Sequence, residues 1–194
     1  MIKIWKGGRT LKELFISIDV EADGPIPGDY SISSFGACVI RSPENGFYRE
    51  LKPISEKYFE RAASISGLDR EKLKISGADP AVAMKEFDQW LKEVCGSDRR
   101  PVFIAFNATY DWMFIHWYFI HFLGHNPFGI SGWDIKAYYA GLMRKRFWWE
   151  TAKKAMDKEF LSKLPHTHNA LDDAREQAEI FQRLRKKALA GSES

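Results

Sequence analysis

The chain has 194 residues, of which 45% are hydrophobic, and its formal net charge is +3. This length and composition are typical of a globular protein with one core, so we expect one domain over residues 1–194, with the motif-bearing core at about 14–189. A net charge this small does not by itself indicate any class of partner.

The sequence does not predict a secreted or membrane protein. The basic residues 1–9 are not followed by a long apolar segment, so no signal peptide is evident. The most apolar window, residues 112–123, is shorter than the roughly 20 residues that span a bilayer. Cys38 and Cys95 have no paired spacing and are expected to be buried thiols. We therefore expect a cytoplasmic protein without a membrane partner.

Residues 14–21 form an apolar run that ends in two carboxylates. Such a run, followed by glycines and prolines, is typical of a central strand buried on both faces. Because side chains alternate along a strand, Asp19 and Glu21 should lie on the same face, a few ångströms apart. A Mg²⁺ or Mn²⁺ ion would relieve their repulsion. The alternative is a solvated strand end at which the two acids never meet, and this pair alone leaves both interpretations open.

The rest of the chain alternates between strand and helix patterns. After the first strand we expect strands at 30–41 and 47–54, joined by a turn at 43–46. A helix at 68–75, opened by Ser66 and Gly67, and a helix between Asp79 and Gly96 should follow. The remaining expected elements are strands at 101–106 and 133–135 and helices at 112–123, 137–143, 150–163 and 171–189. This order predicts an α/β fold with a mixed central sheet, an antiparallel meander plus parallel strands, flanked by helices. Ligands bind such sheets beyond the carboxyl ends of the parallel strands, which places Asp19, Glu21 and Asp111 together.

A fourth acid, Asp173, opens the last helix, and His168 precedes it. Residues five apart on a regular helix point about 140° apart, so the two side chains converge only if His168 lies in the loop before the helix. An imidazole titrates near neutral pH, which suits work as a general base.

Three motifs together resemble those of the DEDDh 3′-to-5′ exonucleases, the group that includes ribonuclease T, oligoribonuclease and the proofreading subunit of bacterial DNA polymerase III. The motifs are Asp19-Val20-Glu21, residues 107–111 and residues 168–174, in the family's order. Each motif alone is weak, and the combination is specific. The resemblance covers residues 14 to 184 and implies a ribonuclease H-like fold.

The resemblance also implies an activity and a set of roles. The family hydrolyses single-stranded 3′ ends of DNA or RNA to nucleoside monophosphates with two Mg²⁺ or Mn²⁺ ions, which stabilise the attacking and leaving oxygens. Asp19, Glu21 and Asp173 would hold one ion, Asp19 would also touch the second, and Asp111 would support that second site through water. His168 would remove the proton from the attacking water.

Two neighbours of these residues compete for the same roles. His166 also precedes the last helix, but the family's five-residue step from it ends at Leu171, which cannot bind a metal. Asp172 is expected to be a solvated acid that the helix dipole favours. We therefore expect His168 and Asp173 to be the functional pair.

The residues expected near the terminal nucleotide are Ala22, Asp23, Ile26 and Asn107. Many relatives have two threonines at the positions of Ala22 and Asp23, and Asp23 would add a negative charge beside the phosphodiester. Ile26 is expected to act as an apolar wedge, as its counterparts do in the family.

Residues 144–163 are basic and aromatic and match no motif. Ring faces on which bases can stack are offered by Trp133, Phe147, Trp148 and Trp149, although most aromatic side chains belong to a core.

A different class of function, a nuclease-fold protein that binds nucleic acid without turnover, also fits the sequence, because fold does not imply function. Several relatives are dimers, so a homodimer is a further expectation.

Overall fold

The structure is a computed structural model that describes residues 11–65 and 67–190, so the basic residues 1–9 and Ser66 lie outside the described range. At its centre is a mixed sheet with the strand order β3-β2-β1-β4-β5. Its strands are β1 (Lys12–Ala22), β2 (Ile32–Val39), β3 (Ser42–Glu50), β4 (Arg99–Ala105) and β5 (Gly132–Asp134). The first three pair antiparallel, and β4 and β5 extend the sheet in parallel from β1. The predicted mixed sheet is confirmed.

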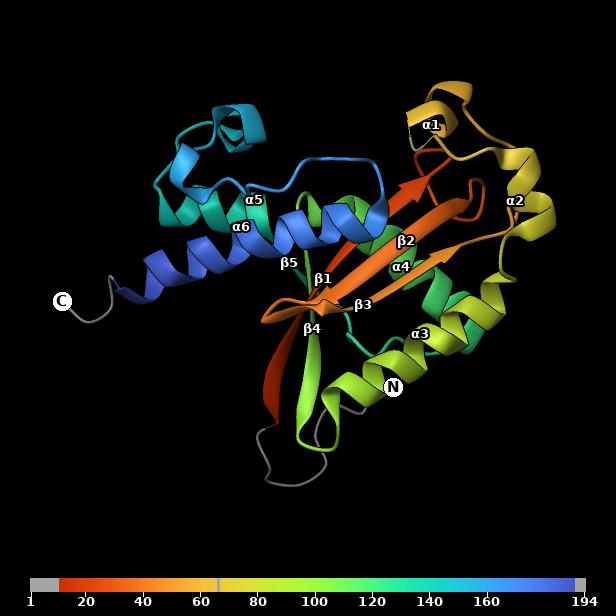
Figure 1. The fold of residues 1–194 in the computed structure, drawn as a ribbon, viewed down its shortest axis with the longest axis horizontal. Coiled ribbons are helices and arrows are strands. Elements are labelled where there is room, and N and C mark those ends of the chain that lie inside the picture. The colour runs from red at the N-terminus through yellow and green to blue at the C-terminus, as the bar shows by residue number, and fades with distance from the viewer. Residues whose placement is uncertain (1–10, 66, 191–194) are drawn as a thin grey trace.

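Helices cover both faces of this sheet (Figure 1). They are α1 (Glu60–Ile65), α2 (Arg70–Ser76), α3 (Pro80–Cys95), α4 (Ala108–Leu123), α5 (Ile135–Leu142) and α6 (Ala170–Ala190), with short 3-10 helices η1 (Trp148–Thr151), η2 (Lys153–Ala155) and η3 (Lys158–Phe160). In Figure 1, α6 runs across one face of the sheet, and α3 and α4 lie on the other. None of the helices in the described ranges is long and apolar enough to cross a membrane.

Strand β1 is buried on both faces, as predicted. Ile16 and Ile18 are fully buried in the core cluster that α3 and α4 share with the sheet. Phe15 packs on the opposite side against Phe181 of α6. Asp19 faces the same side as Phe15, since its carboxylate contacts α6. The strand therefore carries its acids on the α6 face and its core residues on the other.

Gly36 allows α6 to approach the sheet closely at the level of Asp19. It pairs with Asp19 in the β1–β2 ladder. A Cβ atom at Gly36 would lie 2.3 Å from the backbone nitrogen of Leu171 and 2.4 Å from its Cα, so any larger residue would displace the helix. The side chains of Ala170, Ala174 and Ala178 are fully buried and keep the same face of α6 small. The first turn of α6 is therefore held directly above Asp19.

The hairpin between β2 and β3 turns earlier than predicted. Ile40 and Arg41 form the turn, and the expected turn residues 43–46 lie in β3. Val39 pairs with Ser42 and Cys38 pairs with Gly46, so residues 43–45 bulge out of the ladder. Proline and asparagine are common in such irregularities, which explains why the pattern predicted a break at the wrong place.

The helix predicted at 150–163 is wrong. The segment consists of η1, η2 and η3, separated by extended backbone at Ala152, Met156 and Asp157. Tertiary contacts fix it at separate points: the Tyr139 hydroxyl accepts from the Asp157 amide, and Ser162 donates to Glu179 on α6. Such contacts outweigh helix propensity, which is a weak preference.

Smaller differences concern where the other helices begin. Helix α1 was not predicted, and α2 begins at Arg70 because the Asp69 side chain accepts from the amides of Glu71 and Lys72. Helix α4 begins at Ala108, not at residue 112, so Asp111 lies in its first turn. Asp79 and Gly96 cap α3 as predicted, and both cysteines are buried and free.

Substituting Gly36→Ala should destabilise the protein by about 1–3 kcal/mol, because the new methyl group meets backbone that cannot rotate away. The melting temperature should fall by roughly 2–4 °C per kcal/mol, measured by circular dichroism. Gly46→Ala is the matched control, since its Cβ would meet the flexible end of the Leu171 side chain at 2.9 Å. Equal melting temperatures for the two variants would contradict the close approach at Gly36.

Candidate active site

Three acids from distant parts of the chain meet at one end of the sheet. Asp19 and Glu21 lie near the carboxyl end of β1, and Asp173 lies in the first turn of α6. One carboxylate oxygen from each lies within 4.8 Å of the others. Asp173 is fully buried and the other two are half-buried, so the cluster opens to solvent on one side. The predicted meeting of these three carboxylates is therefore present in the structure.

The loop before α6 orients Asp173. The backbone N–H groups of Thr167 and His168 donate to its two oxygens at 2.8 and 2.9 Å. His168 has a φ of 58°, the left-handed conformation that turns the chain back toward the helix. His168 lies in this loop and Asp173 in the helix, which is the arrangement that the five-residue spacing required.

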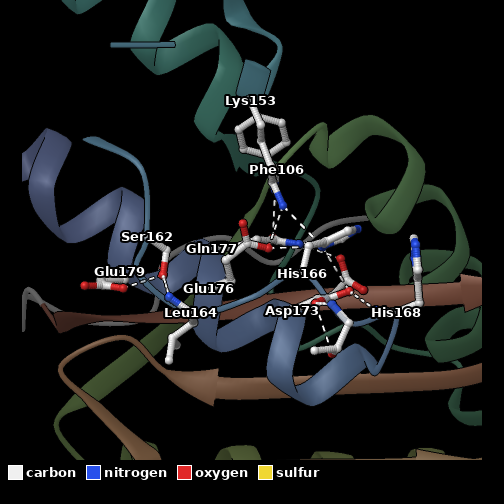
Figure 2. A network of polar contacts seen from close by, with 12 residues as sticks. Phe106, Lys153, Ser162, Leu164, His166, His168, Asp173, Glu176, Gln177 and Glu179 are labelled. Atoms are coloured by element: carbon white, nitrogen blue, oxygen red, sulfur yellow. Dashed lines mark hydrogen bonds and ion pairs between the residues drawn. The ribbon is translucent and has the colours of Figure 1, made fainter. Parts of the chain in front are cut away.

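Two histidines lie next to the cluster, and Figure 2 shows them on either side of Asp173. The Nδ1 atom of His168 lies 3.8 Å from a Glu21 oxygen. The Nδ1 atom of His166 lies 3.1 Å from Asp173 and 3.0 Å from Glu176. Both side chains are a little under half exposed. His166, His168 and Asp173 also form a second group whose potential ligand atoms lie within 4.8 Å of one another.

Asp111 lies outside this group of three but near enough to feel the charges of Asp19 and Glu21, and it has a backbone partner. Its Oδ1 accepts from the N–H of Val20 at 3.0 Å, and the side chain is buried. The ladder between β1 and β4 ends at Ser17 and Ile104, so Val20 lies beyond the reach of β4. The Asp111 carboxylate thus replaces a strand partner and fixes the backbone between Asp19 and Glu21.

The electrostatics of the site favour a cation. Burial raises the pKa of Asp19 well above its ordinary value, and the charges of Glu21 and Asp173 raise it further. Burial and then the charge of Asp173 raise the pKa of Glu21 to about 7. Burial and then the charge of Asp19 raise the pKa of Asp111. A donor set made only of crowded carboxylate oxygens fits a hard divalent ion such as Mg²⁺ or Mn²⁺.

Two side chains that the sequence reasoning missed contact this site. Gln177 lies one turn after Asp173 on α6, donates to Asp19 and accepts from the N–H of Phe106 at 2.8 Å. Lys153 of η2 lies 2.6 Å from Glu176 and 5.2 Å from the centre of the Phe106 ring (Figure 2). Its charge lowers the pKa of Asp19, against the raising effects above.

One of these two residues had a signal in the sequence. Gln177 follows Asp173 by four residues, so both lie on the same helix face, and a polar side chain there could have been noticed. Lys153 had no such signal, because its segment matches no motif and its backbone is not a regular helix.

The residues expected near the nucleotide lie in different environments. Ile26 is 46% exposed, and Asn107 is exposed with a φ of 72° just before α4. Ala22 and Asp23 are buried. The two Asp23 oxygens accept from the N–H of Ser31 and from Arg70, so a buried ion pair neutralises the charge of this acid.

Sequence comparison places this site in a known family. The pattern of the RNase T exonuclease family matches residues 16–181, which include all four acids and His168. The chain belongs to this exonuclease family. The resemblance that the three motifs indicated is confirmed, and with it the prediction of an enzyme.

Named relatives of this exonuclease agree with the assignment. The chain is 46% identical over 173 residues to the 3′-5′ DNA exonuclease Cap18 of Escherichia coli, covering 89% of this chain and 92% of Cap18.

Two solved structures share the fold. The nuclease domain of 3′hExo, a DEDDh family member bound to rAMP, has a TM-score of 0.67 and 19% identity, covering 92% of this chain and 94% of that domain. E. coli exonuclease I with a dT13 oligonucleotide has a TM-score of 0.68 and 14% identity, covering 94% of this chain and 43% of that one.

Without divalent ions the exonuclease should lose stability as pH rises from about 4.5 to about 7. The Glu21 pKa rises from 4.5 when unfolded to about 7 when folded, so the folded state binds the proton more tightly across this range. The melting temperature in EDTA should therefore be several degrees lower at about pH 7.5 than at about pH 5.5. Mg²⁺ should restore it, and more so at the higher pH. Glu21→Gln should reduce both the fall in melting temperature with pH and the greater stabilisation by Mg²⁺ at the higher pH. A rise in melting temperature with Mg²⁺ that is the same at both pH values would contradict the prediction.

Replacing Gln177 with Met should lower the activity or metal affinity of the exonuclease about 10–100-fold, because residues that orient a metal ligand typically have effects of this size. The substitution keeps the volume but removes the bond to Asp19 and leaves the Phe106 N–H unpaired. Activity measured over a Mn²⁺ titration should show a shifted midpoint. Gln89→Met, at an exposed position of α3, is the control and should leave the midpoint unchanged.

Proposed function

We propose that the protein is a metal-dependent 3′-to-5′ exonuclease that releases nucleoside monophosphates from single-stranded DNA. The observation that carries the proposal is the group of three carboxylates within 4.8 Å of one another, flanked by a fourth acid and a solvent-accessible histidine. The 46% identity to a protein named as a 3′-5′ DNA exonuclease supports DNA as the substrate. The exonuclease I structure holds a dT13 oligonucleotide, which supports a single strand.

Asp19, Glu21 and Asp173 would hold the divalent ions, and Asp111 would support them from its place beside Val20. When bound, two such ions stabilise the negative charge on the attacking and leaving oxygens of an in-line displacement at phosphorus. Gln177 keeps the Asp19 carboxylate in one orientation, and the loop amides of Thr167 and His168 do the same for Asp173. Orientation of this kind before the substrate arrives lowers the cost of reaching the transition state.

His168 is the proposed general base. Its side chain is 45% exposed and its Nδ1 lies 3.8 Å from Glu21, so it can take a proton from a water molecule that attacks the terminal phosphodiester. The backbone at His168 is left-handed, and the N–H group of this residue donates to Asp173. His166 is already engaged with Asp173 and Glu176, which suits a supporting role.

The test uses a 5′-labelled DNA oligonucleotide and an RNA of the same sequence, with Mg²⁺ or Mn²⁺. DNA should give a ladder that shortens from the 3′ end, stops with EDTA and is lost with Asp19→Asn. Asp172→Asn is the matched control: this neighbouring acid is exposed and paired with Arg175, so the ladder should remain. His168→Ala should slow the reaction far more than His166→Ala.

Other results would contradict the proposal. Binding of the oligonucleotide in Ca²⁺ without cleavage in any metal would favour the alternative, a nuclease-fold protein that binds nucleic acid without turnover. Cleavage of a circular single strand would show an endonuclease that uses the same acids. Equal rates for His168→Ala and the unmodified protein would remove His168 from the mechanism.

A further inference from the structure

Three consecutive aromatic side chains lie exposed on the surface at η1, in the segment between α5 and η2. Phe147, Trp148 and Trp149 are 51%, 57% and 67% exposed. Aromatic side chains usually bury most of their area, and contiguous exposed apolar groups mark interaction sites. The default interpretation, that these rings belong to the core, therefore does not apply to them.

The backbone that carries these rings is fixed by its own contacts. The Glu150 carboxylate accepts from the N–H groups of Arg146 and Phe147 at 3.1 and 2.7 Å. Thr151 is fully buried, and its hydroxyl donates to the Trp148 carbonyl at 2.6 Å. Binding to a surface that is already ordered costs less conformational entropy than binding to a mobile one.

Positive charges accompany the rings. The Nζ atom of Lys136 lies 4.4 Å from the centre of the Trp148 ring, and the Arg146 guanidinium lies 5.3 Å from the centre of the Phe147 ring. The Phe147 and Trp149 rings are stacked with 13° between their planes. Flat rings interleaved with cations match a single-stranded nucleic acid, whose bases stack and whose phosphates are negative.

Two side-chain contacts link this surface to the neighbourhood of the active site. Lys136 donates to the side chain of Asn107 at 3.4 Å, and Asn107 directly precedes the helix that carries Asp111. At the other end, Lys153 follows Thr151 by two residues and reaches Glu176 beside the carboxylates. A strand whose 3′ end lies at the carboxylates would therefore find these rings close by.

We propose that Phe147, Trp148 and Trp149, with Lys136 and Arg146, form an aromatic platform that binds the nucleotides on the 5′ side of the scissile bond. The bases stack on the rings, and the cations contact the phosphates. The proposal rests on the proposed exonuclease function and adds where the substrate strand runs. It also gives a role to the basic and aromatic segment that matched no motif.

The test compares a long substrate with one that cannot reach the platform. The double variant Trp148→Ala/Trp149→Ala should raise KM for a single strand of about 20 nucleotides roughly tenfold or more, the effect of losing one or two stacked bases, with kcat unchanged. Trp148→Phe/Trp149→Phe keeps flat rings and should keep most of the affinity. Hydrolysis of the p-nitrophenyl ester of thymidine 5′-monophosphate, which has no further nucleotides, reports on the active site alone and should show an unchanged KM in both variants.

The other possible outcomes contradict either the platform or the proposed function. Unchanged KM for the long strand in the alanine variant, with the ester still hydrolysed, overturns the platform and leaves the exonuclease function standing. If the unmodified protein cleaves neither substrate, the proposed function itself fails. A variant that dissociates from dimer to monomer in sedimentation analysis, with the same KM, shows that the rings contact a second copy of the chain. Melting temperatures of both variants check that they fold.

Discussion

The candidate active site depends on holding mutually repelling carboxylates together at one end of the sheet. Three features hold Asp19, Glu21 and Asp173 in place despite their repulsion. Gly36 lets α6 approach β2 closely enough to bring Asp173 above β1. Backbone amides then donate to Asp173, and Gln177 donates to Asp19. The fold therefore pre-forms an anionic site, and the raised pKa values of Asp19 and Glu21 record the unfavourable energy that a divalent cation would relieve.

The sequence predicts most of this arrangement because the relevant signals are local. The apolar run that forms β1 and the two-residue period of a strand place Asp19 and Glu21 on one face. The caps Asp79 and Gly96 fix α3 for equally local reasons. The geometry of a helix alone requires His168 to lie in a loop if it is to reach the side on which Asp173 lies.

What the sequence did not predict depends on contacts between distant segments. Lys153 reaches the site because Thr151, Met156 and Phe160 are buried one after another in a segment with no regular repeat. Arg70 neutralises Asp23 from a helix 47 residues further along the chain. No local pattern encodes such pairings, so the charge at Asp23 and the role of η2 became clear only in three dimensions.

Because Asp111 accepts a hydrogen bond from the N–H of Val20, removing its side chain would disturb the backbone as well as remove a charge. An alanine at position 111 would leave the buried N–H of Val20 without an acceptor, which typically costs about 1–3 kcal/mol. It would also loosen β1 between Asp19 and Glu21. Asparagine keeps an oxygen at the same place and removes only the charge. At this position, therefore, Asp111→Asn tests the role of the charge alone, whereas Asp111→Ala also removes the hydrogen bond to the backbone of β1.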